Sequence, residues 1–250
     1  STFLFALGFS KDKIIETFYS TNKYLYNKET KSWITDFDLE NYKRPLKLSY
    51  DLIDAKNNKK VLGAGEKLNI VIAKKLKEKG LSSISIPNEQ IIGKYLGKDV
   101  KDKSGEILVG AGFDITEEQL NKIIEQEEKE LSIVNIDPIN KGPYILESLK
   151  IDKNTNKSDA LNDIYKVLRP GEAPSVEIAE DIFNNLYFKK ERYDLSEVGR
   201  VKLNSKLDLN TSAKKTILET TDIVAIIKFM LDLRDGKGDV DDIDHLGNRR

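Results

Sequence analysis

The sequence contains no cysteine and a single histidine, His245. Without cysteine the chain has no disulfide bonds and no thiolate metal sites, which fits a reducing compartment. One histidine excludes metal sites built from several histidines and argues against a histidine-based catalytic triad. The sequence also lacks any run of about 18 apolar residues, so it predicts no transmembrane helix. The apolar start STFLFALGFSKDK has no basic residues before it, unlike a signal peptide.

Positive charge is not in excess. The 41 lysine and arginine residues are balanced by 42 aspartate and glutamate residues, so the net charge of −1 gives no overall signal for nucleic-acid binding. Arginine is unevenly placed, however, because six of the seven arginines lie at or after residue 169 and only Arg44 precedes it. The planar guanidinium group suits phosphates and base edges. The last third of the chain is therefore either a nucleic-acid surface or a region of internal ion pairs.

The first 37 residues predict two short helices followed by a β-hairpin. Gly8 ends the first helix and Ser10 caps the second. The segment YLYNKETKSWITDFDL then alternates apolar and polar residues around a turn, which is typical of a hairpin. Its aromatic residues are expected to pack in a core rather than to stack on bases; they are Tyr24, Tyr26, Trp33 and Phe37.

The middle of the chain contains an internal repeat. Residues 61–86 and 108–136 each hold a short apolar strand, a Gly-Ala-Gly turn, a helix-capping residue, an amphipathic helix and a second strand. The turns lack the spacing and the Lys-Ser/Thr pair of a phosphate-binding loop, so we interpret them as structural. Between the copies, residues 91–95 predict a further strand and residues 103–105 a hairpin turn. The pattern indicates a duplicated β-α-β module folded into a barrel or sandwich-like body.

The sequence after residue 137 is mainly helical. The turn-rich stretch 137–143 marks a boundary, and residues 144–152 predict a strand. Residues 160–168 predict a helix that Pro170 ends. A second helix follows over residues 176–188, with Ser175 as its cap. Its apolar side chains are expected to be buried; they are Val176, Ala179, Ile182, Phe183 and Leu186.

Two more helices are expected towards the C-terminus. Asp194 or Ser196 caps a short helix in which Arg200 and Lys202 point outward. Thr221 and Asp222 cap an apolar helix over residues 223–233, with Met230 in the core. Arg234, near its end, either interacts with the helix dipole or contacts DNA.

The aspartate-rich segment 239–244 invites a metal-site interpretation. An EF-hand loop needs a glutamate at its last position and a following helix, and neither is present. A catalytic Mg²⁺ site needs a preorganised pocket, which one segment cannot establish. We favour aspartates that cap backbone amides and pair with Arg249 and Arg250. His245 is then a hydrogen-bonded structural histidine.

Three stretches resemble the β subunit of bacterial DNA-directed RNA polymerase. Arg169–Pro174 reads RPGEAP, with Ala173 where the family often has proline. Arg192–Asn204 reads RYDLSEVGRVKLN, and Gly238–Arg250 reads GDVDDIDHLGNRR, as in the family. The segments 141–148 and 6–15 resemble the same family less closely.

The resemblance implies a fragment of that subunit covering its lobe 2. Residues 1–18 and 138–250 would form the discontinuous lobe, and residues 19–137 a lineage-specific insertion. The expected fold class is α+β, with a mostly helical lobe and an inserted, duplicated β-rich module of barrel-sandwich type. The chain is expected to continue beyond both ends of the sequence.

The resemblance also implies contacts with DNA. The gate loop would consist of Arg169, Pro170, Gly171, Glu172, Ala173 and Pro174. Asp244 and Arg249 match a pocket for an unpaired non-template base, where a carboxylate can accept hydrogen bonds from guanine and a guanidinium can donate them. The full set of expected DNA-binding residues is Arg169, Arg192, Arg200, Lys202, Asp244 and Arg249.

No catalytic residue, metal site or cofactor is expected in this chain. By the resemblance, the Mg²⁺ of the whole nucleotidyltransferase is bound by the partner subunit. The expected partners are the β′, α and ω subunits, a sigma factor, and promoter and downstream DNA, with no membrane. The location would be the cytoplasm, at the nucleoid. Two other functions stay open: a stand-alone protein-interaction module that uses the repeat, and a metal-dependent hydrolase that uses segment 239–244.

Overall fold

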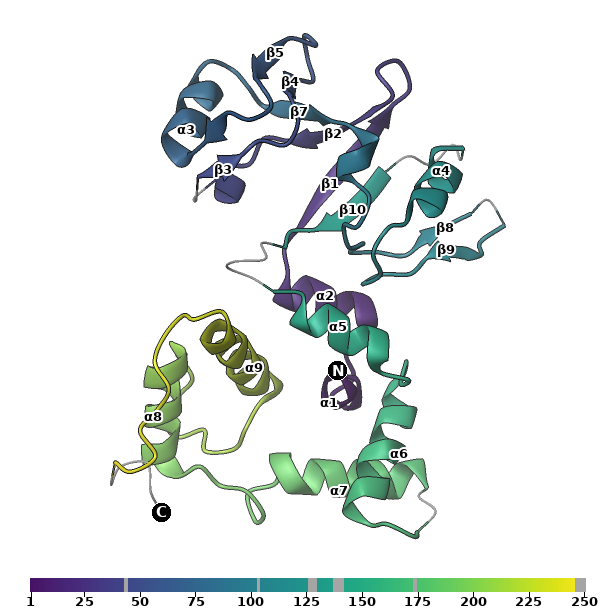
Figure 1. The fold of residues 1–250 in the computed structure, drawn as a ribbon. Coiled ribbons are helices and arrows are strands. Elements are labelled where there is room, and N and C mark those ends of the chain that lie inside the picture. The colour runs from purple at the N-terminus through teal and green to yellow at the C-terminus, as the bar shows by residue number, and fades with distance from the viewer. Residues whose placement is uncertain (43–44, 103, 126–129, 137–141, 173–174, 246–250) are drawn as a thin grey trace. The chain divides into compact units, whose positions relative to one another are not determined.

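The computed structural model describes residues 1–42, 45–102, 104–125, 130–136, 142–172 and 175–245, except for the side chain of Glu40. The chain forms two compact units. Unit 1 consists of Ser1–Ile14 and Ile136–Arg250, and unit 2 consists of Ile15–Asn135. The described part of unit 1 is helical, whereas unit 2 combines strands with helices (Figure 1). The fold class is therefore α+β, as predicted.

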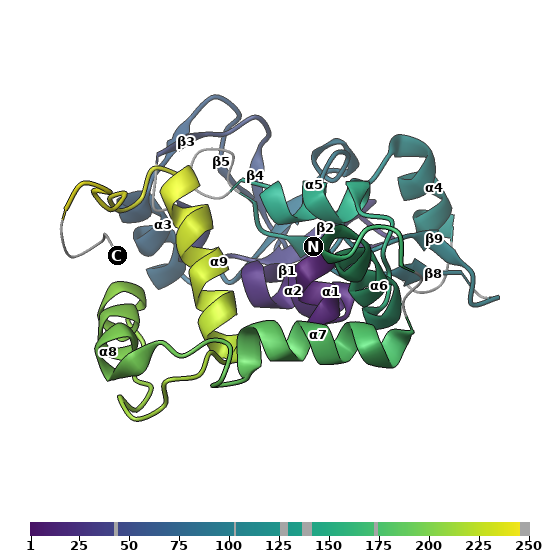
Figure 2. The same ribbon diagram turned by 90° about the horizontal axis from the view of Figure 1, so that it is seen from below.

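Unit 1 is built from helices that lie far apart in the sequence. They are α1 (Thr2–Ala6), α5 (Tyr144–Ile151), α6 (Lys157–Leu168), α7 (Val176–Phe188), α8 (Ser196–Leu207) and α9 (Thr220–Arg234). Helix α2 (Lys11–Phe18) crosses the boundary between the units. Both ribbon views show α1 beside α6 and α7 (Figures 1 and 2). The two predicted helices at the N-terminus are thus confirmed.

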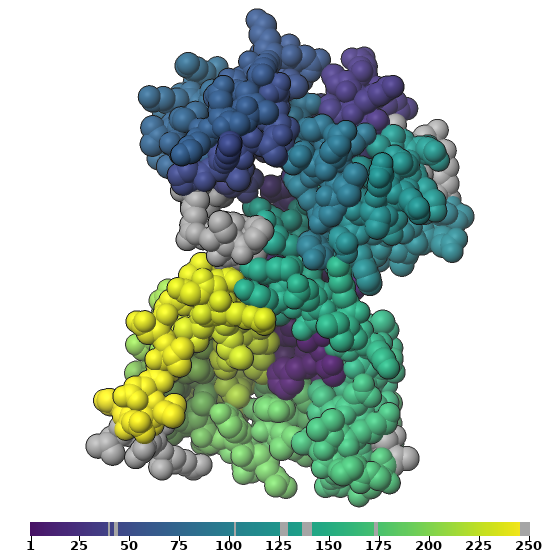
Figure 3. Space-filling view, viewed as in Figure 1, coloured from purple at the N-terminus to yellow at the C-terminus, as the bar shows by residue number. Residues whose placement is uncertain are grey.

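The N-terminal helix packs into the core of unit 1. The Phe3 ring centroid lies 5.3 Å from that of Phe183 and 5.2 Å from that of Tyr187, both on α7. In the space-filling view the purple N-terminal segment lies among the green helices of the unit (Figure 3). Apolar burial therefore joins chain segments separated by the whole of unit 2.

A carboxylate fixes the same junction. The Asp152 side chain follows α5 and accepts hydrogen bonds from Ser1 Oγ at 2.6 Å and Thr2 Oγ1 at 2.7 Å. The backbone N–H of Asn154 donates to its other oxygen at 2.9 Å. Burial raises the pKa of Asp152, but the hydrogen bonds outweigh burial and the pKa lies below its usual value. Asp152 therefore holds the start of α1 against the end of α5 in its charged form.

The predicted strand over residues 144–152 is wrong, because this segment is helix α5. Its buried residues Ile145, Leu146 and Leu149 are spaced one, three and four positions apart, which places them on one face of a helix. Pro143 immediately precedes the helix, where a missing N–H group has no consequence. Tertiary burial of this face decides between helix and strand.

Helix α7 has the predicted bounds, and the Ser175 hydroxyl accepts a hydrogen bond from the Ile178 backbone N–H at 3.3 Å. Ala179 and Phe183 are buried as predicted. Val176 and Leu186 were expected in the core but are 43% and 39% exposed. They lie towards the two ends of α7.

Unit 2 contains a six-stranded antiparallel sheet in the order β10-β1-β2-β7-β4-β5. Its strands are β1 (Thr21–Asn27), β2 (Ser32–Asp36), β4 (Leu52–Asp54), β5 (Lys60–Leu62), β7 (Ser83–Ile86) and β10 (Glu130–Val134). The smaller elements are β3 (Leu46–Lys47), β6 (Lys67–Leu68), β8 (Val100–Lys101), β9 (Ile107–Val109), α3 (Ile70–Glu78), α4 (Glu117–Glu125), η1 (Leu39–Tyr42) and η2 (Asn88–Gln90). The predicted hairpin is β1–β2, and it lies between the closing strands of the two repeat copies, β7 and β10.

The two copies share their turn geometry. Asp51 accepts a hydrogen bond from the Ala64 backbone N–H at 2.8 Å, and Asp99 accepts one from Ala111 at 2.6 Å. In each Gly-Ala-Gly turn the second glycine has a positive φ, +89° for Gly65 in the first copy and +80° for Gly112 in the second. Such φ values favour glycine. The turns are thus fastened by an aspartate about a dozen residues upstream.

These hydrogen bonds extend the repeat upstream of the region that the sequence indicated. The N–H of Gly65 donates to the Leu48 carbonyl at 2.8 Å, and that of Gly112 donates to the Leu96 carbonyl at 2.7 Å. Each copy therefore includes an additional short segment. In the second copy this segment was predicted as a strand over residues 91–95, which is wrong: Tyr95 makes only an isolated bridge with Asp114.

Trp33 occupies the centre of the unit 2 core. Its side chain is 0% exposed, its Nε1 donates to Asn88 Oδ1 at 3.0 Å, and its ring packs 5.1 Å from that of Tyr26. Tyr24 and Phe37 are also buried. The predicted aromatic core is therefore confirmed.

We expect Trp33→Ala to lower the free energy of unfolding of unit 2 by about 3–5 kcal/mol, because it leaves a large cavity. Urea unfolding followed by circular dichroism measures the change. Leu25→Ala, in the same hairpin but at a side chain that is 52% exposed, is the control and should change stability by about 0.5 kcal/mol or less. Equal losses in the two variants would contradict a core built on Trp33.

Candidate nucleic-acid interface

The predicted gate loop begins at the end of α6 and is held to that helix by Glu172. The Tyr165 hydroxyl, on a buried side chain of α6, donates to Glu172 Oε2 at 2.6 Å. Arg169 Nη1 lies 3.7 Å from the same oxygen. The hydrogen bond to Glu172 raises the pKa of Tyr165. Gly171 has φ +94°, which lets the chain turn back towards the helix.

Residues 169–172 of the predicted gate loop therefore form a short turn with internal contacts. Arg169 and Glu172 are more than half exposed, so the ion pair between them is a surface pair. Ala173 and Pro174 lie outside the described residues. Ser175 then begins α7.

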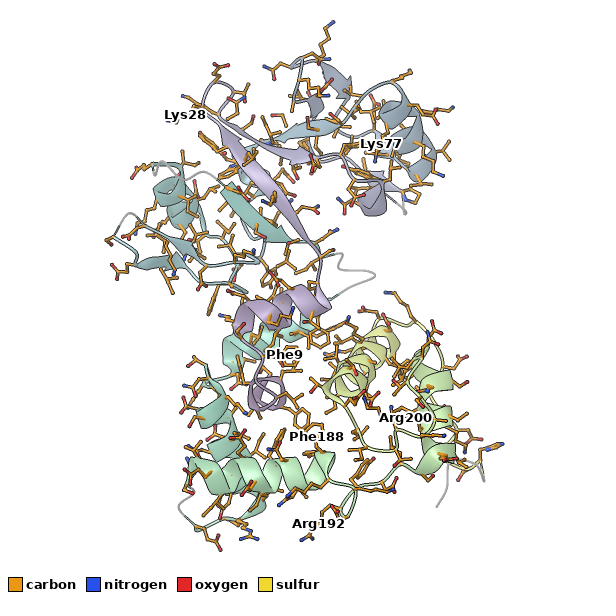
Figure 4. All side chains as sticks on the ribbon, turned by 180° about the vertical axis from the view of Figure 1, so that it is seen from behind. Phe9, Lys28, Lys77, Phe188, Arg192 and Arg200 are labelled. Carbon is orange, nitrogen blue, oxygen red and sulfur yellow. The ribbon has the colours of Figure 1, made fainter. Side chains whose placement is uncertain are left out.

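Arg200 does not point outward, and this prediction is wrong. Its side chain is 0% exposed, and its Nη1 lies 2.8 Å from Asp222 Oδ1 on α9, which is also 0% exposed. Its Nε donates to the Lys215 carbonyl and its Nη2 to the Ile217 carbonyl, each at 2.6 Å. Figure 4 shows Arg200 between α8 and α9. In this structure its guanidinium group is enclosed by protein.

Helix α8 thus buries Arg200, against the prediction, and exposes Lys202, as predicted. Val198 and Val201 are 69% and 54% exposed. A buried guanidinium is tolerated only when it is paired and hydrogen-bonded, and Arg200 meets both conditions. The N-cap residue of α8 is Leu195, whose side chain makes no capping bond, rather than the predicted Asp194 or Ser196. Both predicted residues still bond to the first turn, since Asp194 Oδ1 accepts from the Ser196 N–H at 2.9 Å and Ser196 Oγ from the Gly199 N–H at 3.4 Å.

Asp222 has a second bond at the start of α9. Its Oδ2 accepts a hydrogen bond from the Glu219 backbone N–H at 2.8 Å, so it caps the helix from its third position while its other oxygen pairs with Arg200. Met230, predicted in the core of α9, is 62% exposed, and this prediction is wrong. Helix α9 is thus buried at Asp222 in its first turn and exposed at Met230 near its end.

The C-terminal end of α9 is bound to the start of α5. The Arg234 guanidinium carbon lies 4.0 Å from the Tyr144 ring centroid, a cation–π contact. Next to it, Asp235 Oδ1 accepts a hydrogen bond from the Gly142 backbone N–H at 3.3 Å. Arg234 therefore has a structural contact within unit 1.

Three of the other predicted DNA-binding residues lie on the surface of unit 1. Arg192 is exposed in the turn after α7, where its N–H donates to the Lys189 carbonyl at 3.0 Å (Figure 4). Lys202 is exposed on α8. Asp244 is exposed, and its N–H donates to Asp242 Oδ1 at 2.9 Å. Arg249 lies outside the described residues.

An ion pair joins α8 to the aspartate-rich segment. Lys206 Nζ lies 2.7 Å from Asp241 Oδ1 and 5.0 Å from the Phe229 ring centroid on α9. Lys202 lies one helical turn before Lys206, on the same face of α8. The structure therefore brings Lys202 to the side of α8 that faces segment 239–244.

Two aspartate side chains of this segment make contacts within unit 1. Asp241 pairs with Lys206, and Asp242 accepts the backbone bond from Asp244. The His245 N–H donates to the Asp242 carbonyl at 3.3 Å. Among the residues that the structure describes, no three His, Cys, Asp or Glu side chains are grouped as metal ligands. Within the same residues, the helices are all too short or too polar to cross a membrane.

Sequence reasoning missed the two carboxylates that organise this region, Glu172 and Asp222. Glu172 was counted only as a loop residue, and Asp222 only as a cap. The arginines that they contact lie 3 and 22 residues away, respectively. The capping pattern at Glu219 and Asp222 was readable, but nothing in it indicates a partner on another helix.

Comparison with known proteins gives the family. Residues 115–250 match the family model described as RNA polymerase Rpb2, domain 2. The chain therefore belongs to the RNA polymerase Rpb2 domain 2 family.

Similar bacterial proteins match along the whole chain. They include proteins named DNA-directed RNA polymerase subunit beta from Ehrlichia canis (46% identical), Rickettsia felis (44%) and Rhizobium leguminosarum (43%). In each case the match covers 100% of this chain and 18% of the relative. The chain thus spans about a fifth of the length of these relatives, and their similarity extends through unit 2.

We expect Arg200→Met to lower the free energy of unfolding of unit 1 by about 3–5 kcal/mol, because it leaves the Asp222 carboxylate buried without a partner. In a double-mutant cycle measured by urea unfolding, Arg200→Met/Asp222→Leu should cost at least about 2 kcal/mol less than the sum of the single changes. Lys202→Met, on the exposed face of the same helix, is the control. If Arg200→Met were no more destabilising than Lys202→Met, the buried pair would not hold α8.

Proposed function

We propose that the chain is a region of an RNA polymerase β subunit, acting in DNA-templated transcription. In this proposal it forms part of one jaw of the cleft that holds DNA. The family match and the printed names of the relatives support the assignment. The isolated chain would not catalyse nucleotidyl transfer, because it would supply DNA contacts rather than catalytic groups.

The observation that carries the proposal is the Lys206–Asp241 ion pair. It joins helix α8, which includes most of the stretch 192–204, to the stretch 238–250, through residues that lie 35 positions apart in the sequence. These two stretches are among those that resemble the family most closely. Arg192, Lys202 and Asp244 are exposed on these two stretches. A surface that presents two cations and a carboxylate suits a flexible single strand, with phosphates on the cations and a base edge on the carboxylate.

Within that surface the proposed base pocket uses Asp244 and Arg249. A carboxylate accepts hydrogen bonds from the amino and imino groups of guanine, and a guanidinium donates to acceptor atoms or to a phosphate. The pocket would hold one unpaired base of the non-template strand. Arg200 has no place in this set, because its role is to fix α8 beneath the exposed Lys202.

The gate loop, residues 169–174, is the second proposed DNA-facing element. Its first half is held to α6 by the Tyr165–Glu172 hydrogen bond, and prolines at positions 170 and 174 restrict the backbone. A loop of this kind keeps its position at low entropic cost when a partner approaches. Arg169 would face the entering DNA or the opposite side of the channel.

The proposed partners are the β′, α and ω subunits, a sigma factor, and promoter and downstream DNA. The Mg²⁺ ion of the whole enzyme would be held by the partner subunit. Residues 19–137, which hold most of unit 2, would be a lineage-specific insertion of barrel-sandwich type within the lobe.

We expect Arg249→Ala in the assembled polymerase to shorten the open-complex lifetime or alter pausing in a way that depends on the non-template base. Loss of a bidentate contact discriminates between bases by about 1–3 kcal/mol. Promoter templates that differ only at that base provide the measurement. Arg192→Ala, which would remove a phosphate contact, should change all four templates alike. An Arg249→Ala effect of equal size for all four bases would contradict the assignment of Arg249 to a base pocket.

We expect the 250-residue chain alone to bind DNA with a Kd of about 1 µM or weaker near physiological salt, because it neutralises few phosphates. Fluorescence anisotropy with a labelled single strand and a labelled duplex measures this. Sub-micromolar, salt-sensitive binding would contradict the expectation and would assign much more of the polymerase's DNA affinity to this region.

A further inference from the structure

The two copies of the repeat in unit 2 carry opposite charge. Residues 45–80 contain nine lysines and four acidic residues, whereas the equivalent residues 93–127 contain five lysines and eight acidic residues. The near-zero charge of the whole module conceals this segregation. The two copies share one fold. A side chain that differs between equivalent positions of the copies is therefore not needed for that fold.

The excess lysines of the first copy form what we call the basic patch. Its members are Lys47 on β3, Lys67 on β6, and Lys74, Lys75 and Lys77 on α3. All five side chains are exposed. Within the described part of the chain, none of the five has an ion-pair partner, whereas Lys60 of the same copy pairs with Asp51 at 2.9 Å. Figure 4 shows Lys77 on α3.

The repeat shows that these lysines are not required for folding. Their structural equivalents in the second copy are Tyr95, Asp114, Asn121, Lys122 and Ile124. Four of the five positions thus carry no positive charge there, although the same turn and helix form and the equivalent Tyr95–Asp114 bridge is made. A role outside the fold is the simplest reason for the lysines of the first copy.

The pairing of β3 with β6 places two lysines of the basic patch opposite each other. Lys47 pairs directly with Lys67 between β3 and β6. The equivalent pair in the second copy is Tyr95 with Asp114. Like charges opposite each other in an antiparallel pair are destabilising, and here no acidic neighbour among the described residues neutralises them. Such an arrangement is stabilised when a polyanion binds.

We propose that the basic patch binds the phosphate backbone of duplex DNA without reading its sequence. The choice of DNA rests on the proposed function, which places the chain beside DNA; the charge segregation does not depend on it. Lysine ammonium groups are point charges that suit phosphates and carry no base readout. The patch offers Val71 but no aromatic ring, so it lacks a platform for stacking unpaired bases.

The dimensions of the patch suit a duplex. Helix α3 has nine residues and is therefore about 13 Å long. At about 3.4 Å of axial rise per nucleotide of one strand, this length spans roughly four phosphates. The exposed lysines occupy most of the solvent-facing side of α3, where Glu78 is the one acidic side chain. The surface therefore matches a run of phosphates in both charge and length.

The test compares two charge reversals of equal size in the 250-residue chain. The patch variant is Lys67→Glu/Lys74→Glu/Lys77→Glu, and the control is Lys28→Glu/Lys101→Glu/Lys122→Glu, three exposed lysines elsewhere in unit 2. Anisotropy of a labelled 30-base-pair duplex is measured from low to physiological salt. Circular dichroism establishes that both variants stay folded.

We expect the patch variant to weaken duplex binding at least tenfold at low salt and to reduce the slope of log K against log salt by about 2–3. The control should weaken binding less than threefold. Equal effects of both variants would overturn the proposal, because net charge alone would then explain them. Unchanged binding by the patch variant would also overturn it.

A polyglutamate of matched charge separates DNA from an acidic protein partner. We expect the chain to bind the duplex at least fivefold more tightly than polyglutamate. Equal or tighter binding of polyglutamate would overturn the proposal in favour of an acidic protein. These results are independent of the open-complex measurements on Arg249→Ala, so failure of the patch and failure of the proposed function can be told apart.

Discussion

Arg200 and Asp222 hold opposite charges in a place from which water is excluded, and the exposed surface of α8 depends on them. Each would be costly to bury alone, so the pair fixes both the rotation of α8 and the start of α9. The guanidinium also binds the carbonyls of Lys215 and Ile217, which shapes the link between the two helices. With Arg200 turned inward, Lys202 and Lys206 are left on the outside, and Lys206 can pair with the segment that carries Asp244. One buried polar contact thus places the exposed charges of the proposed single-strand surface.

Local sequence patterns predict correctly those helices and strands whose buried side chains follow the periodicity of the helix or strand itself. Helix α7 and the β1–β2 hairpin have the predicted positions because capping, spacing and alternation all agree there. Helix α5 was misread since its Tyr-Ile-Leu start suits a strand, and only packing against distant helices selects the helical form. Arg200 was misplaced for a related reason: a charged residue on a short helix is expected outside unless its partner is known. That partner lies on another helix, and no local rule identifies it.

The two copies of the repeat share the residues that fix the backbone but differ in the charges on their surfaces. The aspartate that fastens each turn and the glycine with positive φ are the same in both copies, because the backbone requires them. The exposed positions differ in charge because the backbone does not constrain them. The similarity of the two copies in sequence identifies the turns but not the charge difference. The net charge of the two copies taken together is small, because the positive charge of the first copy offsets the negative charge of the second. The structure aligns the copies residue by residue, and the difference then becomes visible.

The bond between Ser1 and Asp152 joins residues 151 positions apart, with all of unit 2 between them. A ribosome adds roughly 5–20 residues per second, so the first helix waits roughly 8–30 s before its partner is synthesised. During that interval the apolar face of α1, including Phe5, has no permanent cover, whereas unit 2 can already close on itself. The apolar face of α1 therefore stays uncovered by its partners during synthesis until α5 to α7 have been added to the chain.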